Sequence, residues 1–298
     1  MTQRILDLES HQLAHLRGRA LTASVAASEG RALVAEVWPN TAMLASAHET
    51  GGVSNMELVS AFGADIVILN MIEKVFDGAA WDFPVMGRYP DLAALADFLG
   101  RPIGVNLEPG NVPALRASTV ENAKRLVDQG AALLCVTANP ATGATLADIA
   151  RTSEELRSAL GDDVAIWSGK MHMAGRLEPL DVAGMSGIAE AGADGVLVPL
   201  PGTVPGVTRE IAAEAVRRIH AAGAIAMGTI GTSQEGSHRN LVPQLALNAK
   251  EIGVDAHHIG DAYVAGAMDP EFLYAYSVAI RGRRHTWHRM ARNTRKRA

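Results

Sequence analysis

The feature of this chain that most constrains its fold is an alternation of short apolar runs with amphipathic segments, repeated along almost the whole sequence. Eight apolar runs are predicted to be β-strands, at 33–38, 66–70, 103–108, 132–137, 164–172, 195–199, 225–229 and 256–259. Each run is followed by a polar or Gly/Pro-rich loop and then by a segment with helical spacing. Strands that alternate with helices without an intervening linker are typical of parallel α/β folds. We therefore expect a single (β/α)₈ TIM barrel.

Short signals mark the ends of the predicted helices. Gly-Ala-Asp or a near relative precedes four of the strands, at 63–65, 130–132, 192–194 and 253–255. Glycine there suits the C-cap of a helix, and the next residues turn into the strand. Helix starts are predicted where Ser/Thr-x-x-Glu forms a capping box, beginning at Ser54, Ser118 and Thr152. An open, doubly wound sheet is the competing architecture, but no Gly-x-Gly-x-x-Gly opens a helix after the first strand.

The two ends of the chain are expected to lie outside the barrel. We expect one domain over residues 1–298, with a leading helical segment at 1–30 that contains a helix at 10–27. The segment 282–298 is strongly basic. It is interpreted as a solvated tail or as an arm that packs on a neighbouring subunit of a homo-oligomer, and a nucleic-acid patch is the alternative.

Composition narrows the class of protein. The 298 residues are 48% hydrophobic and carry a net charge of -5, which argues against nucleic-acid or membrane-surface binding by the whole chain. No apolar run reaches the ~18 residues of a membrane helix, and the N-terminus does not have the pattern of a signal peptide. The single cysteine, Cys135, allows no internal disulfide and fits a reducing cytoplasm. We expect a cytoplasmic protein without nucleic-acid or membrane partners.

Polar residues appear where the predicted strands end, and in a TIM barrel those ends converge on the face that carries the active site. The side chains expected there, from the first strand onward, are Glu36, Asn70, Asn106, Glu108, Thr137, Asn139, Ser168, Lys170, His172 and one of His257 and His258. Side chains alternate along a strand, so only one of the two adjacent histidines can point inward. We expect His258. The proposed substrate-binding residues are Asn70, Asn106, Thr137, Asn139 and His258.

The fifth predicted strand, 164–172, carries the most reactive candidate. Alternation is expected to place Ser168, Lys170 and His172 on the inward face, with Trp167 and Met171 on the other. An inward lysine with a depressed pKa can act as a Schiff-base nucleophile. Two alternatives stay open, namely an ion pair with Glu108 or Glu36 and a contact with a substrate phosphate or carboxylate.

Three further residues are predicted to move protons. His172 is expected to act as an acid, a base or a donor to an oxyanion. Glu108 is the first choice for the general base, and Glu36 is the second. No cofactor is predicted. A divalent metal held by His172, His258 and Glu108 is the least supported possibility.

The loops after the seventh and eighth strands are predicted to hold a phosphate. Many barrels bind phosphate there through backbone N–H groups that glycine leaves accessible. The predicted donors are Gly231, Thr232, Ser233, Gly260, Asp261 and Ala262. Ordinary tight turns, which also use glycine, are the alternative.

Several motifs together resemble a bacterial TIM-barrel family whose members carry phosphonomutase-like or haloacid-dehalogenase-like labels. The motifs are Gly104-Val-Asn-Leu-Glu-Pro109, Gly169-Lys-Met-His172, Pro201-Gly-Thr-Val-Pro-Gly-Val207, Gly231-Thr-Ser-Gln-Glu-Gly236 and His257-His-Ile-Gly-Asp261. The chain departs from phosphoenolpyruvate mutases and isocitrate lyases, because it lacks their Asp-rich magnesium site and their Lys-Thr or Lys-Cys gating motif. It also lacks the Asp-x-Asp of haloacid dehalogenases. A second similarity, through Asn139-Pro-Ala-Thr-Gly143, is to the barrel family of a photosystem-biogenesis factor.

These observations predict an enzyme with carbon–carbon lyase, aldolase or isomerase activity on a small phosphorylated carbonyl compound, either a sugar phosphate or a 2-oxo acid. Lys170 is central to this prediction, through a Schiff base or through stabilisation of an enolate. Two alternatives remain. One is a metal-dependent enzyme similar to phosphoenolpyruvate mutase or isocitrate lyase, and the other is a non-catalytic barrel with a binding or assembly role.

Overall fold

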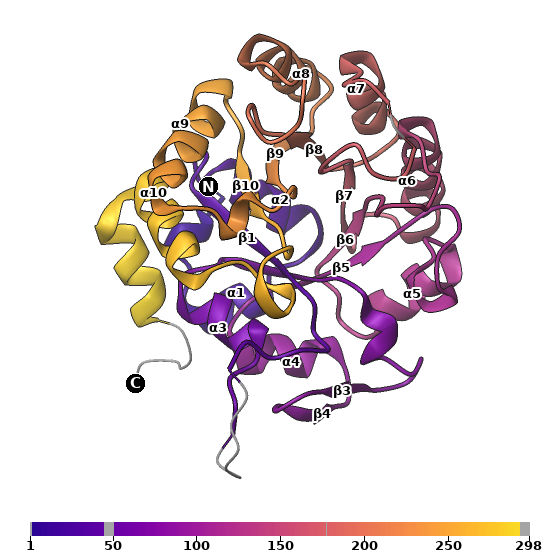
Figure 1. The fold of residues 1–298 in the computed structure, drawn as a ribbon. Helices are drawn as coiled ribbons and strands as arrows, with labels where there is room; N and C mark the ends of the chain where they lie inside the picture. Colours follow the sequence, from indigo (N-terminus) through magenta and orange to yellow (C-terminus); the bar gives the residue numbers. More distant parts are fainter. Residues whose placement is uncertain (1, 45–50, 177, 293–298) are drawn as a thin grey trace.

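Eight parallel strands close into a barrel in the computed structural model, which describes residues 2–44, 51–176 and 178–292 (Figure 1). Around the barrel the strands follow the order β1-β10-β9-β8-β7-β6-β5-β2. Their bounds are β1 Ala32–Val37, β2 Ile66–Leu69, β5 Ile103–Leu107, β6 Leu133–Val136, β7 Ala165–Gly169, β8 Gly195–Pro199, β9 Ile225–Ile230 and β10 Ala256–Ile259. All eight predicted strands and the TIM barrel are therefore confirmed, and closure of the sheet excludes the open doubly wound alternative.

Helices surround the barrel as a ring (Figure 1). One follows each barrel strand: α3 Asn55–Ala61, α4 Leu92–Leu99, α5 Val120–Asp128, α6 Leu146–Leu160, α7 Val182–Glu190, α8 Arg209–Ala221, α9 Val242–Ile252 and α10 Pro270–Ala291. A small hairpin, β3 Trp81–Phe83 and β4 Gly87–Tyr89, lies between β2 and α4. Short 3₁₀ helices are η1 Ile5–Asp7, η2 Ile72–Lys74, η3 Ala114–Arg116, η4 Gln234–Gly236, η5 Arg239–Leu241 and η6 Val264–Gly266. No helix within the described ranges is long and apolar enough to cross a membrane.

The predicted helix starts are correct in one case of three. Ser54 caps α3 through a full capping box with Glu57. The prediction at Ser118 is wrong by one residue, because the side chain of Thr119 caps α5. The prediction at Thr152 is wrong, because Thr152 lies inside α6, which begins at a capping box formed by Thr145 with Asp148. Ser/Thr-x-x-Glu also occurs inside helices, so the pattern alone does not locate a helix start.

The Gly-Ala-Asp signature has a structural role at both of its ends. The glycines at 63, 130, 192 and 253 all have positive φ, between 89° and 108°, which suits the end of a helix. Each aspartate then accepts a hydrogen bond from a backbone N–H at the start of the neighbouring strand. These bonds are Leu33 to Asp65 at 2.9 Å, Ile166 to Asp194 at 2.9 Å and Ala226 to Asp255 at 2.8 Å. The signature therefore joins consecutive strands at the N-terminal end of the barrel.

The leading segment packs over this same end. The helix predicted at 10–27 is broken into α1 Ser10–Ala14 and α2 Gly18–Ala26. At the break, the N–H of Gly18 donates to the carbonyl oxygen of Ala132 on the barrel. Side chains of η1, α1 and α2 join one apolar cluster with the inward-facing residues of the strands. The segment therefore closes the bottom of the barrel and lies outside the ring of strands, as expected.

The predicted solvated basic tail is wrong for residues 282–291, which belong to α10. Gly282, with φ 73° and ψ 165°, interrupts this helix and turns it back on itself. Arg281 and Arg289 on the two sides of the turn are buried and pair with Asp65, at 2.5 and 2.7 Å. Basic residues in this segment therefore serve partly as internal ion-pair partners. The remainder of the predicted tail, 293–298, lies outside the described residues.

Candidate active site

The alternation predicted for the fifth barrel strand, β7, is wrong. Trp167 points into the barrel, where it packs with interior residues and donates from its indole Nε1 to Thr22 of α2 at 3.1 Å. Ser168 instead points outward and bonds with Ser153 of α6 at 2.8 Å. All five residues of β7 are buried, so burial does not distinguish the two faces of this strand.

Lys170 accordingly lies away from the barrel interior. Its Nζ donates to a carboxylate oxygen of Glu178 at 2.5 Å and to the carbonyl oxygen of Arg176 at 2.7 Å. The lysine side chain is only 6% exposed, and both bonds lie in the loop that follows β7. The ion-pair alternative therefore describes Lys170 best, but its partner is Glu178 and neither Glu108 nor Glu36.

Glu36 of β1 is the centre of the network inside the barrel. One of its oxygens accepts from Asn106 Nδ2 of β5 at 2.5 Å, and the other lies 2.6 Å from Nε2 of His258 on β10. All three side chains are almost completely buried. The neighbouring His257 points outward and bonds to Tyr276 and to the backbone of Gly30. The prediction that His258 is the inward histidine is therefore confirmed.

Burial shifts both members of the Glu36–His258 pair toward their neutral forms. It raises the pKa of Glu36 to about 8, with a further increase from the charge of Glu108. Burial also lowers the pKa of His258 to about 4, against the opposing effect of the nearby acids Asp261 and Glu235. A low-dielectric site disfavours an isolated charge on either group. The contact between Glu36 and Nε2 of His258 therefore allows one proton to be shared by the two side chains.

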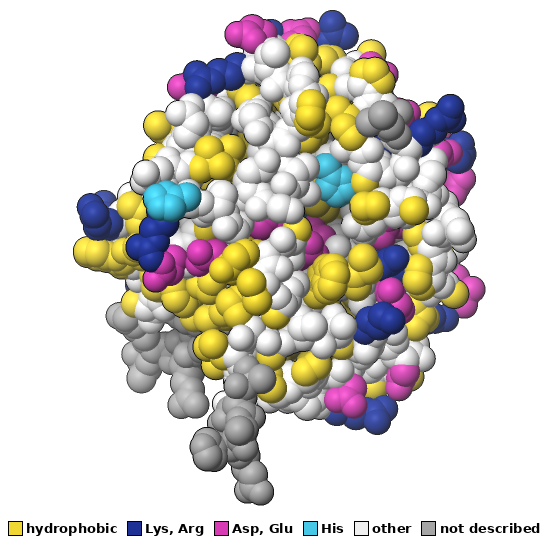
Figure 2. All heavy atoms as spheres, viewed as in Figure 1, with side chains coloured by type: hydrophobic (Ala, Val, Ile, Leu, Met, Phe, Trp, Pro, Cys, Tyr) yellow, Lys and Arg dark blue, Asp and Glu magenta, His cyan; other side chains and the backbone are white. Residues whose placement is uncertain are grey.

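Further acids lie beside this pair. Asp261, in the loop after β10, accepts a hydrogen bond from Asn70 at the end of β2 at 3.0 Å. Burial, followed by the charge of Glu36, raises the pKa of Asp261 to about 7. Glu235 in η4 is fully buried and accepts from the N–H of Ala262 at 3.0 Å, and burial raises its pKa also. Figure 2 shows acidic and histidine side chains near the centre of the face it views, while most lysine and arginine side chains lie toward the edge.

Glu108, the predicted general base, is held by several donors. Nδ2 of Asn139 donates to it at 2.7 Å, and the backbone N–H of Asn139 donates to its other oxygen. The guanidinium of Arg116 lies 3.0 Å away and also pairs with Glu73 at 3.2 Å. Both oxygens of Glu108 already accept from Asn139, whereas the Glu36–His258 pair keeps Nδ1 of His258 without a hydrogen-bond partner among the described residues. The geometry therefore favours Glu36, the second choice, over Glu108.

Several buried polar atoms near the network have no hydrogen-bond partner in the described part of the chain. They are Nδ1 of His258, Oδ1 of Asn106, Oγ1 of Thr137 and Oε2 of Glu235. Buried polar groups are nearly always satisfied in folded proteins. A cluster of such atoms at the C-terminal end of a barrel therefore suits contact with a bound polar molecule.

His172 follows β7 and lies within electrostatic reach of the network. Burial lowers its pKa, and the charges of His258 and Lys170 lower it further. Its Nδ1 accepts from the N–H of Ala174 at 3.0 Å. Within the described ranges, however, no three His, Cys, Asp or Glu side chains are arranged to hold one metal ion, including the predicted set with His258 and Glu108. The residues do not fit the predicted metal site.

In the loops predicted to bind phosphate, several of the predicted donors already make hydrogen bonds within the protein. The N–H of Gly260 donates to Ile230 at 2.7 Å, and the N–H of Ala262 donates to Glu235. The hydroxyl of Thr232 donates to the carbonyl oxygen of Thr203 at 2.7 Å. The carboxyl groups of Asp261 and Glu235 belong to the same two loops, and as carboxylates they would repel an anion. Gly231 and Ser233 lie in the first loop, with Ser233 at a positive φ of 74°.

Sequence reasoning missed Glu235 and Arg116 as members of the site. Glu235 lies within the glycine-rich stretch 231–236, where an acid between glycines was a visible signal. Arg116 comes from η3, which lies after β5, and no sequence pattern distinguishes it from other basic loop residues. Its role depends on the loop folding back onto Glu108.

A family model described as Domain of unknown function (DUF7916) matches residues 6–296. No curated protein matches the chain. Among solved structures, the chain is similar to a candidate lyase/mutase from Burkholderia cenocepacia J2315, with a TM-score of 0.54, 15% identity, and coverage of 84% of this chain and 81% of that one. It is also similar to 2,3-dimethylmalate lyase of the PEP mutase/isocitrate lyase superfamily, with a TM-score of 0.50, 13% identity, and coverage of 85% and 81%.

An archaeal fructose 1,6-bisphosphate aldolase is also similar, with a TM-score of 0.48, 16% identity, and coverage of 85% of this chain and 95% of that one. At these identities the likeness shows the barrel fold alone. Two of these neighbours, the candidate lyase/mutase and the member of the PEP mutase/isocitrate lyase superfamily, share the barrel fold with the chain, and the resemblance of its motifs to phosphonomutase-like barrels stays a prediction.

Proposed function

The chain belongs to the family described as Domain of unknown function (DUF7916), and from the network inside its barrel we propose a lyase or isomerase that transfers protons to and from a small carbonyl compound. The observation that carries this proposal is the buried Glu36–His258 pair, with its 2.6 Å contact and with Nδ1 of His258 lacking a hydrogen-bond partner among the residues that the structure describes. General acid–base catalysis requires a group that can hold or release a proton near neutral pH. The raised pKa of Glu36 meets that requirement.

The chemistry follows from the two protonation states of the pair. When Glu36 is a carboxylate and Nε2 of His258 carries the shared proton, Nδ1 has a free lone pair that can take a proton from a carbon next to the substrate carbonyl. With one more proton on the pair, Nδ1 becomes a donor to the carbonyl or enolate oxygen. Asn106 holds the second oxygen of Glu36 in both states. Removal of the carbon-bound proton and its return to the neighbouring carbon gives isomerisation. In a lyase reaction Nδ1 would instead take the proton of a hydroxyl on the β carbon, so that the bond between the α and β carbons breaks, the β carbon becomes a carbonyl and the α carbon becomes an enolate that is then protonated.

The proposed substrate is a small carbonyl compound that carries hydroxyl groups. Asn106 Oδ1 and Glu235 Oε2 are acceptors without a partner in the described part of the chain, and Thr137 offers a hydroxyl. Such groups suit the hydroxyls of a ketose or aldose. Asp261 and Glu235 repel an anion when they ionise, so a phosphorylated substrate would require its phosphate to lie away from these two side chains.

Hydrogen–deuterium exchange tests the proposal. The protein is incubated in D₂O with ketoses, aldoses, dihydroxyacetone phosphate, other sugar phosphates and pyruvate, and loss of the proton next to the carbonyl is followed by ¹H NMR. We expect exchange with at least one hydroxylated carbonyl compound, and its loss in His258→Asn and Glu36→Gln. The control Lys170→Met should retain exchange, because Lys170 is bound to Glu178 outside the network.

Borohydride trapping separates this proposal from Schiff-base chemistry. The same compounds are incubated with the protein, borohydride is added, and intact mass is measured. The proton-transfer proposal expects no covalent adduct. An adduct mapped to Lys170 would support the aldolase alternative instead, and absence of exchange with every compound would favour a barrel with a binding role.

A further inference from the structure

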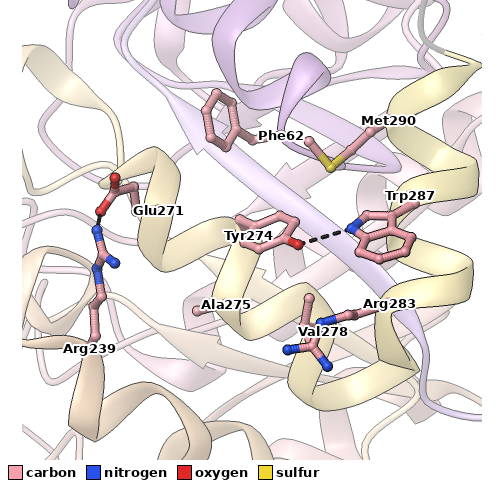
Figure 3. Close-up of a pocket in the computed structure, with 9 residues that line it drawn as sticks. All are labelled: Phe62, Arg239, Glu271, Tyr274, Ala275, Val278, Arg283, Trp287 and Met290. Atoms are coloured by element: carbon pink, nitrogen blue, oxygen red, sulfur yellow. Dashed lines mark hydrogen bonds and ion pairs between the residues drawn. The ribbon is translucent and has the colours of Figure 1, made fainter.

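A groove with a volume of about 690 Å³ lies on the outside of the barrel, between α3 and the two arms of α10 (Figure 3). The arms are the stretches of α10 before and after Gly282. Figure 3 shows Phe62, the residue that follows α3, near Met290 of the second arm. Ala275 and Val278 of the first arm lie below them in this view, and the ion pair of Arg239 with Glu271 lies at the left. Volumes of this size are typical of sites for small molecules.

The groove is held in shape by buried bonds beneath it. Gly282 turns the chain in a conformation that side-chain-bearing residues rarely adopt. Arg281, directly before the turn, and Arg289, further along the second arm, both pair with Asp65. Between the arms the hydroxyls of Ser277 and Thr286 bond at 2.9 Å. The two arms are therefore fixed relative to each other, and a ligand would find a preformed site.

One wall of the groove is aromatic. The indole Nε1 of Trp287 donates to the hydroxyl of Tyr274 at 2.9 Å, which orients the ring toward the groove (Figure 3). Trp287 is 55% exposed, whereas Trp81 and Trp167 are fully buried. An oriented and exposed indole offers a large apolar surface at low cost in conformational entropy.

The rim of the groove is positively charged. Arg239 is paired with Glu271, and this pair lies at one end. Arg283 also lines the groove and is exposed, and its guanidinium has no hydrogen bond or ion pair with the residues that the structure describes. The chain as a whole is acidic, with a net charge of -5. An unpaired guanidinium beside an apolar wall is complementary to an anionic group on an apolar body.

We propose that this groove binds a small amphipathic anion, with an aromatic or branched aliphatic body against Trp287 and Met290 and a carboxylate, sulfonate or phosphate on Arg283. A protein partner fits less well. Stable protein interfaces bury about 800 Å² on each side. Among the large apolar side chains of the groove, Trp287 is exposed, while Phe62 and Met290 are half-buried.

Titration with the aromatic sulfonate 1-anilinonaphthalene-8-sulfonate tests the proposal on the full chain. We expect saturable fluorescence enhancement with one site per chain, accompanied by energy transfer from tryptophan that falls in Trp287→Phe but does not vanish, because Trp38, Trp81 and Trp167 remain. Arg283→Ala should weaken binding about tenfold, which is the size expected for loss of one charge-assisted contact. Arg284→Ala is the matched control, because Arg284 is exposed on the same arm but does not line the groove. It should change affinity less than twofold.

A second variant fills the groove. Ala275→Phe should abolish binding while the thermal melting curve stays cooperative. N-phenyl-1-naphthylamine, which lacks the sulfonate, should bind equally to wild type and Arg283→Ala. Equal affinities of Arg283→Ala and Arg284→Ala for the sulfonate, or binding that survives Ala275→Phe, would overturn the proposal. A concentration-dependent increase in mass that Trp287→Ala removes would assign the groove to a second copy of the chain instead.

Discussion

Two groups of buried ionisable side chains lie at opposite ends of the same barrel. They differ in whether each acid is paired with a group of opposite charge. At the N-terminal end, Asp65 accepts from Arg281, Arg289 and the N–H of Leu33. Although burial alone would raise the pKa of Asp65, the two guanidiniums hold it below its usual value. At the C-terminal end, acids are gathered with one another, and burial raises the pKa of Glu36 and Asp261.

We infer from this contrast that the N-terminal cluster is structural and that the C-terminal cluster carries the proposed function. Arg289 also donates to the carbonyl oxygens of Ile5 and Leu8, so the N-terminal cluster ties the first residues of the chain to the last helix. In the C-terminal cluster, His258 and Asn106 each keep a side-chain atom that has no hydrogen-bond partner within the described ranges. Unfavourable burial of ionisable groups is typical of sites where the protein has a chemical task.

The largest expected effect on stability comes from Asp65→Ala. This change leaves two buried guanidiniums without a counter-charge, and we expect a loss of about 3–5 kcal/mol in the free energy of unfolding, measured by urea denaturation. Asp255→Ala is the matched control. Asp255 makes the same strand contact, to Ala226, but its other partner is the exposed His220. We expect the control to cost about 1 kcal/mol. Equal losses in the two variants would remove the distinction between the clusters.

The largest expected effect on activity comes from the other end of the barrel. His258→Asn and Glu36→Gln should lower proton exchange with the substrate by about 10²–10⁴-fold, which is the usual contribution of general acid–base catalysis. Glu36→Gln removes a carboxyl whose raised pKa lowers stability at pH 7, so the variant should be at least as stable as wild type at that pH. Urea denaturation and exchange rates measured on the same preparations check both expectations. A large loss of stability in Glu36→Gln would make this cluster structural too.

The sequence was sufficient for the fold and for part of this cluster. The positions of the strands follow from apolar runs and glycine signals, and these are local. On β1 and β5, Glu36 and Asn106 are polar residues within buried strands, so they identify the inward face toward the network. The same reasoning correctly selected His258 over His257. In these cases one polar side chain distinguishes the face toward the polar network from the apolar face of a buried strand.

The sequence does not determine which side chains point into the barrel where both faces of a strand are buried. On β7, Trp167 and Ser168 are both fully buried, one in the barrel and one against α6, so alternation allowed either orientation. Packing determines the orientation, because the indole of Trp167 packs with residues inside the barrel and donates to Thr22. The prediction that the basic C-terminal segment is solvated is wrong for Arg289 for a related reason, which applies also to the neighbouring Arg281. Their partner, Asp65, lies more than two hundred residues away in sequence, and no local pattern reports a distant counter-charge.

The two clusters should respond in opposite ways to a rise in pH. Glu36 has an ordinary pKa of 4.5 that is raised to about 8, and Asp261 an ordinary pKa of 3.8 that is raised to about 7. The folded state then binds more protons than the unfolded state, so stability falls as pH rises through this interval, by up to about 1.4 kcal/mol per pH unit for each group. Asp65, with a lowered pKa, contributes stability that is lost only as pH falls below about 4.

Urea denaturation at pH 6.5 and 8.5 measures this dependence. The lowered pKa of His258 makes stability rise with pH only between about pH 4 and 6.5. Above pH 6.5, His258 therefore adds nothing to the pH dependence of stability. Wild type should be less stable at pH 8.5 than at pH 6.5, by about 1–2 kcal/mol. The difference should shrink in Glu36→Gln and persist in Asp255→Ala. A pH dependence unchanged in Glu36→Gln would assign the effect to other groups.

The smallest expected effect concerns Lys170, which lies at the C-terminal end of the barrel but outside the functional cluster. Lys170→Met removes the ion pair with Glu178 and should cost about 1–2 kcal/mol in stability, as for a partly buried charged hydrogen bond. Glu178→Gln should have a similar effect, and the double variant should cost less than the sum of the two single changes. All three should exchange substrate protons within about threefold of wild type, because the pair donates nothing to Glu36 or His258. If Lys170→Met instead abolishes exchange while Glu178→Gln retains it, the lysine must leave Glu178 during the reaction, and the functional cluster then extends to β7.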